Sequence, residues 1–128
     1  MAVIMLPDTF GKADESELGN QEVRALYDKG TSYAVQASGC AVRWSAGDAY
    51  IFYSLAERYL RTASKTVISD ADGDAMLAAA SSPHVFIDLM IVQELRKKSC
   101  ERAVGMNQKI IELEDTPGAG NENPTDSL

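Results

Sequence analysis

The stretch that decides the fold covers residues 83–114 and reads PHVFIDLMIVQELRKKSCERAVGMNQKIIELE. Apolar or small residues recur in it at intervals of three and four, the spacing of one face of an α-helix. Pro83 suits the first helical position, where its missing N–H would have no partner within the helix, and Ser81 or Ser82 can cap the helix. Gly105 costs only about 1 kcal/mol in a helix. We therefore predict one continuous helix over these residues.

The predicted helix carries an apolar seam that Arg96 interrupts. About 30 residues at 1.5 Å per residue span about 45 Å, whereas a compact domain of this size has a radius of gyration of about 14 Å. We therefore expect either an elongated molecule or a seam that docks in part on another chain. The seam positions are Val85, Leu89, Val92, Ser99, Ala103, Met106, Ile110 and Leu113.

A basic cluster lies in the middle of the same helix. Arg96 falls on the seam itself, where a charge tends to set register and partner choice. The cluster is expected either to meet acidic groups of a partner or of residues 14–17, or to form a solvated patch. It consists of Arg96, Lys97, Lys98 and Arg102.

A second helix is predicted over residues 17–44. Its many small residues allow a neighbouring backbone to approach closely, but they lower its intrinsic helicity. A break near Gly30 or Gly39 and a strand over residues 33–42 are therefore left open. Its seam consists of Val23, Leu26, Gly30, Tyr33, Ala37, Cys40 and Trp44.

Residues 45–48 (SAGD) predict a turn in which Asp48 caps the next helix. That helix is expected over residues 49–65, with Glu57 and Arg61 paired at i and i+4 on its solvated face. A short alanine-rich helix is expected over residues 74–80. The inward positions of the longer helix are Phe52, Leu55, Ala56, Tyr59 and Ala63.

Asp70, Asp72 and Asp74 resemble the start of a calcium-binding EF-hand loop, in which alternate carboxylates converge on the ion. Ala75 stands where that loop needs glycine, and Ser81 stands where it needs a bidentate glutamate. We therefore predict a capping loop, since acidic groups are also favourable at a helix N-terminus.

The predicted fold class is all-α: a helical bundle or extended helical hairpin of about four helices with a long C-terminal helix. Residues 1–16 are expected to form a flexible N-terminal arm, and residues 17–114 the helical domain. Residues 115–128 lack an apolar run and are rich in Gly, Pro and Asn, which predicts a disordered acidic tail.

Composition argues against several classes of function. The formal charge of −7 disfavours binding to a nucleic-acid backbone or an anionic membrane surface. His84 is the single histidine, and Cys40 and Cys100 lie far apart, so no metal site, cofactor site or nucleophilic triad is predicted. The first residues lack the basic start of a signal peptide. We expect a protein that is cytoplasmic at synthesis, and we leave a non-classical secretion route open.

These patterns favour a non-enzymatic interaction or assembly protein that oligomerises through its long C-terminal helix. The partner is expected to be a second copy or another protein, with no nucleic acid, membrane or small-molecule substrate. The alternative is a small acidic adaptor, chaperone or inhibitor that binds a single protein partner. The predicted interaction residues are Val85, Leu89, Val92, Arg96, Arg102, Ala103, Met106, Ile110 and Leu113.

Overall fold

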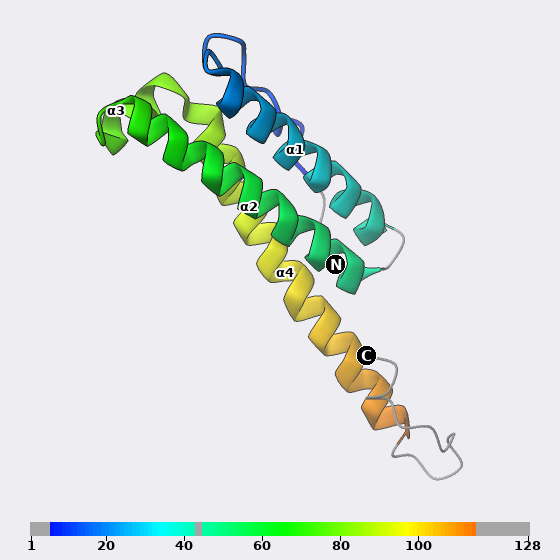
Figure 1. Ribbon diagram of the computed structural model, residues 1–128. Coiled ribbons are helices and arrows are strands. Elements are labelled where there is room, and N and C mark those ends of the chain that lie inside the picture. Colours follow the sequence, from blue (N-terminus) through cyan, green and yellow to red (C-terminus); the bar gives the residue numbers. More distant parts are fainter. Residues whose placement is uncertain (1–5, 43–44, 115–128) are drawn as a thin grey trace.

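The computed structural model describes residues 6–42 and 45–114, with the side chains of residues 6–41 and 45–105. These residues form four α-helices and no strand (Figure 1), which confirms the predicted all-α bundle with a long C-terminal helix. The helices are α1 (Gln21–Val42), α2 (Ala46–Asp70), α3 (Ala75–Ser81) and α4 (Pro83–Glu114).

α1 and α2 lie side by side and α4 runs along α2 (Figure 1). Fully buried alanines occupy the interior of both α1 and α2, including Ala34 and Ala56. A Cβ atom added at Gly30 would lie only 2.8 Å from Cγ of Leu60. Glycine therefore permits a close approach of the two helices at this point rather than breaking α1. The alternative strand over residues 33–42 is wrong, because these residues are helical.

The start and end of α2 differ from the prediction. The helix begins at Ala46, so the predicted turn over residues 45–48 is wrong. Asp48 lies in the first turn, where its Oδ2 atom accepts a hydrogen bond from Oγ of Ser45 at 2.6 Å instead of capping a later helix. The helix continues past residue 65 to Asp70, and the buried Val67 anchors this last part to the core.

The capping predictions for α3 and α4 are confirmed only in part. Oδ1 of Asp74 accepts a hydrogen bond from the backbone N–H of Leu77 at 3.1 Å, so Asp74 caps α3. α4 begins at Pro83 as predicted. The side chain of Ser82 does not cap it, because its Oγ atom donates a hydrogen bond to the carbonyl oxygen of Glu17 at 2.8 Å.

At two places the buried face of α4 lies one residue before the position that the predicted seam assigns. Leu89 is only partly buried and Arg96 is half-buried, whereas the positions directly before them, Asp88 and Leu95, lie in the interior. Because the seam is predicted from apolar residues, it passes over Asp88 and includes Leu89 instead. The buried positions are Val85, Asp88, Val92, Leu95 and Ser99.

The described part of the N-terminal segment packs against the helices as turns. Phe10 and Leu18 are buried in the common core, and Leu6 packs against it in part. Residues 1–5, Trp44 and the tail over residues 115–128, for which we made predictions, lie outside the described residues.

Within the described part of the chain, no single helix has the length and apolar character needed to cross a membrane. α3 and α4, which meet at a bend of 98°, satisfy that test of length and composition only when they are taken together.

Candidate functional site

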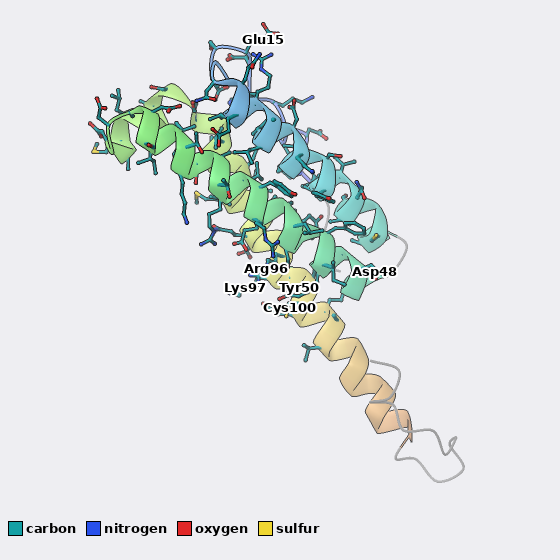
Figure 2. All side chains as sticks on the ribbon, viewed as in Figure 1. Glu15, Asp48, Tyr50, Arg96, Lys97 and Cys100 are labelled. Carbon is teal, nitrogen blue, oxygen red and sulfur yellow. The ribbon has the colours of Figure 1, made fainter. Side chains whose placement is uncertain are left out.

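α4 is longer than the helix against which it packs. Its Arg96 meets α2 near the start of that helix: the guanidinium group donates hydrogen bonds to Oγ of Ser54 at 3.0 Å and to the hydroxyl of Tyr50 at 3.2 Å. α2 runs antiparallel to α4 and begins only four residues before Tyr50. The start of α2 therefore lies about one helical turn beyond Arg96, near Cys100 (Figure 2).

Beyond that point α4 extends past the ends of α1 and α2 (Figure 1). We call residues 101–114 the projecting half of α4. At 1.5 Å per residue it is about 21 Å long. Val104 within it is 57% exposed. Adding residues to an existing helix requires no nucleation. The free energy of this elongation is close to zero in water, and Gly105 makes it less favourable. Packing on the apolar face is therefore the stabilisation that this segment still requires.

The face of α4 that packs against α2 continues along the projecting half. Eighteen residues make five complete turns of an α-helix, so positions eighteen apart share one face. The buried positions 85, 88, 92 and 95 thus correspond to positions 103, 106, 110 and 113, which are Ala103, Met106, Ile110 and Leu113. All four belong to the predicted seam. The sequence therefore continues the apolar stripe of α4 beyond the first turn of α2.

Apart from Arg96, which is described in the next paragraph, the predicted interaction residues fall into three groups. Val85 and Val92 are fully buried within the chain, and Leu89 packs against the same core, so these three make intramolecular contacts. Ala103 and Arg102 are half-buried in the projecting half. The side chains of the remaining three, Met106, Ile110 and Leu113, lie outside the described residues, although their backbone is helical.

Arg96 contacts α2 rather than the acidic residues near the N-terminus. Besides its two hydrogen bonds, the guanidinium carbon lies 5.2 Å from the ring centroid of Tyr50, and Nε lies 3.7 Å from Oε1 of Glu57. Glu57 also pairs with Arg61 at 2.9 Å, as predicted from their i, i+4 spacing. Because one planar cation has several partners on α2, Arg96 helps to fix the register of α4 at the place where α4 leaves the bundle.

A buried polar cluster lies toward the other end of α4, and the sequence did not reveal it. Asp88 is fully buried, and its Oδ2 atom accepts hydrogen bonds from the Tyr27 hydroxyl and from the backbone N–H of Gly11, the latter at 3.1 Å. The Tyr27 hydroxyl accepts in turn from the N–H of Ala13 at 3.2 Å. Oδ1 of Asp88 has no hydrogen-bond partner among the described residues. The only signal in the sequence is a single acid inside an apolar run.

Burial changes the proton affinity of this cluster. It raises the pKa of the Asp88 carboxyl group, an effect that the bonds from Tyr27 and Gly11 oppose only in part. Burial and the neighbouring Asp88 carboxylate likewise raise the pKa of the Tyr27 hydroxyl. The cluster connects α1, α4 and the N-terminal turns through one carboxyl group, so its role is to hold the N-terminal segment on the bundle.

Glu17 provides the cap that α4 lacks in its local sequence. Its Oε1 atom accepts a hydrogen bond from the backbone N–H of His84 at 2.9 Å, and its Oε2 atom lies 2.8 Å from Nδ1 of His84. The N–H of Asp14 also donates to Oε2, at 3.1 Å. A carboxylate at a helix N-terminus is favourable because free N–H groups and the helix dipole meet it there. His84 therefore has a structural role at the start of α4.

A cavity of about 250 Å³ lies between the start of α1, the end of α2 and α3. Apolar side chains and two carboxylic acids, Glu17 and Asp70, share its wall. Within the part of the chain that the structure describes, no group of three or more His, Cys, Asp or Glu side chains is placed to hold a metal ion. The lining residues are Glu17, Asn20, Val23, Val67, Asp70, Ala71, Leu77, Ala78, Ser81 and Ser82.

Comparison with protein-family profiles, with curated proteins and with solved structures finds no match to this chain.

Proposed function

We propose that this protein is a non-enzymatic assembly protein that associates with a second copy of itself through the projecting half of α4. The observation that carries the proposal is that α4 extends past the start of α2 at Ala46, while its sequence repeats the spacing of the core-facing positions. Within the bundle, α2 covers this face. Alongside the projecting half, Figure 1 shows no other helix of the described chain, and a helix from another molecule would cover the stripe there.

The residue types on the stripe favour pairing between two copies. In heptad terms, Ala103 and Ile110 occupy a positions, and Met106 and Leu113 occupy d positions. A β-branched residue at a with leucine at d favours two-stranded pairing.

The projecting half carries a small part of the chain's net charge. The whole chain has a formal charge of −7, which makes two copies repel each other. The projecting half contains three acids (Glu101, Glu112 and Glu114) and two basic residues (Arg102 and Lys109), so its own formal charge is −1. The projecting half therefore contributes only one unit of the chain's net negative charge to the repulsion between two copies.

Sedimentation velocity between about 1 and 200 µM tests the proposal. We expect a dimer whose fraction rises with concentration, because two heptads form only a short interface. Ile110→Lys places a charge on the stripe and should shift association to at least tenfold higher concentration, while the melting curve of the bundle stays unchanged. Ile111→Lys is the matched control, because position 111 lies off the stripe. A wild-type monomer at 200 µM, or equal effects of the two changes, would refute the proposal.

The alternative function, binding of one different protein partner, is supported by a separate surface. Met76 is 85% exposed and Met90 is 68% exposed, and Ile87 and Leu77 are also largely open. These residues lie on α3 and on the first half of α4. Exposed methionine side chains suit adaptable protein contacts. This function predicts that Met90→Lys abolishes binding to a partner without changing self-association.

A further inference from the structure

The cavity between α1, α2 and α3 has an apolar wall and an acidic rim. Val23 and Val67 are buried beneath it, Ala78 is fully buried, and Leu77 is 54% exposed. The described lining residues include neither Lys, Arg nor His. The cavity thus offers an aliphatic surface next to acidic groups without a basic residue in its own wall.

The two acids of the wall differ in how they are neutralised. Glu17 accepts hydrogen bonds from the backbone N–H groups of His84 and Asp14, and its Oε2 atom lies 2.8 Å from Nδ1 of His84. Asp70 accepts a hydrogen bond from Nδ2 of Asn20 at 2.8 Å, which is a neutral donor. Asp70 is exposed, and no basic side chain of the described cavity wall faces it.

The position of Asp70 in α2 increases this imbalance. It is the last residue of the helix, and the last turn of α2 contains no basic residue. The C-terminal end of a helix carries a partial negative charge, so an acid is unfavourable there and a cation is favourable. A positively charged group beside Asp70 would relieve both the side-chain charge and the helix dipole.

From this geometry we infer that the cavity is a binding site for a small aliphatic amine. Its ammonium group binds the Asp70 carboxylate at the end of α2, and its alkyl chain lies against Leu77 and the small accessible part of Val67. The ammonium group supplies the positive charge that the last turn of α2 lacks, and the alkyl chain of the amine covers the exposed part of Leu77. This inference is independent of the proposed self-association, since the cavity lies at the opposite end of the bundle from the projecting half.

The probe is n-hexylamine, titrated into ¹⁵N-labelled full-length protein at pH 7 and followed by amide chemical shifts. Hexan-1-ol has the same chain length without the charge and serves as the ligand control. We expect saturable shifts at Asn20, Ala71 and Leu77 with the amine, and clearly weaker shifts with the alcohol. Equal affinities for the two compounds, or no saturation with the amine, would overturn the inference.

Asp70→Asn should weaken the affinity for hexylamine by about tenfold, the lower range for loss of a charge-assisted contact at an accessible site. Asp72→Asn removes an equal charge two residues away, outside the cavity wall, and asparagine tolerates the positive φ of 56° at that position. It should change the affinity less than twofold. Leu77→Ser tests the alkyl contact and should weaken binding several-fold. If Asp72→Asn weakened binding as much as Asp70→Asn, the amine would be attracted to the acidic surface in general, and the proposed site at Asp70 would be refuted.

Discussion

The hydroxyl group of Tyr27 in α1 donates a hydrogen bond to the Oδ2 atom of Asp88 in α4, inside the protein. The same carboxyl oxygen accepts a hydrogen bond from the backbone N–H of Gly11, so one buried acid joins two helices and the N-terminal turns. The second oxygen, Oδ1, has no hydrogen-bond partner among the described residues. A buried carboxyl group with this asymmetry should make the stability of the fold depend on pH.

Asp88→Asn should reveal that dependence. Burial raises the pKa of Asp88 above its usual 3.8 in the folded state. Below pH 3.8 the group is protonated in both states and has no effect on folding. As pH rises from 3.8 through the folded pKa, the unfolded state loses its proton more readily, so this group destabilises the fold. The free energy of unfolding of the Asn variant, minus that of the wild type, should therefore increase between pH 4 and pH 7 in urea titrations. A constant difference would contradict the burial of an ionisable group here.

Tyr27→Phe tests the other side of the same hydrogen bond. The change removes one of the two donors to Oδ2 of Asp88 and the acceptor for the N–H of Ala13. Loss of a partner for a buried polar group costs about 1–3 kcal/mol. Tyr50→Phe removes a hydroxyl that accepts from the partly exposed Arg96, and it should cost less than about 1 kcal/mol. Urea denaturation at pH 7 would compare the two, and equal costs would mean that the buried cluster contributes no special stability.

The architecture follows from the sequence because its signals are local. The intervals of three and four over residues 83–114, the proline at position 83 and the cap at Asp74 each act within a few residues, and the structure contains α4 and α3 as expected. The polar cluster could not be predicted in the same way. Glu17 and His84 are 67 residues apart and Tyr27 and Asp88 are 61 apart, so only the folded chain brings them together. The displaced seam has the same cause, since Asp88 becomes a core residue only through partners distant in sequence.

Replacement of leucines in α4 measures this displacement directly. Leu95 is buried on the observed face, whereas Leu89 belongs to the predicted seam and packs only at the edge of the core. Leu95→Ala should cost about 2–5 kcal/mol, as for other leucines truncated in a packed core. Leu89→Ala should cost clearly less. Thermal or urea unfolding distinguishes the two, and a larger cost at Leu89 would favour the face predicted from sequence.

Replacing glycine by alanine should have opposite effects on stability at two helical positions, Gly30 and Gly105. At Gly30 in α1, the new Cβ would lie 2.8 Å from Cγ of Leu60 and 3.3 Å from the carbonyl oxygen of Ala56. Alanine gains about 1 kcal/mol in helix propensity, but overpacking costs typically about 1–3 kcal/mol. Because part of the obstruction is backbone, we expect Gly30→Ala to destabilise the bundle, measured as a lower urea midpoint. An increase would show that the α1–α2 contact has room to relax.

Gly105→Ala should instead strengthen the projecting half. A Cβ at this position meets no atom within 4 Å, and the residue is exposed within a helix. The gain of about 1 kcal/mol in helix propensity lies in the segment that we propose pairs with a second copy. If two projecting halves fold more completely when they pair, the gain applies to each of them, and the dimer should form at several-fold lower concentration in sedimentation velocity. Helix content by circular dichroism should rise slightly, while the urea midpoint of the bundle should stay unchanged. Higher helix content without tighter association would separate the stability of this helix from self-assembly and would count against the proposed interface.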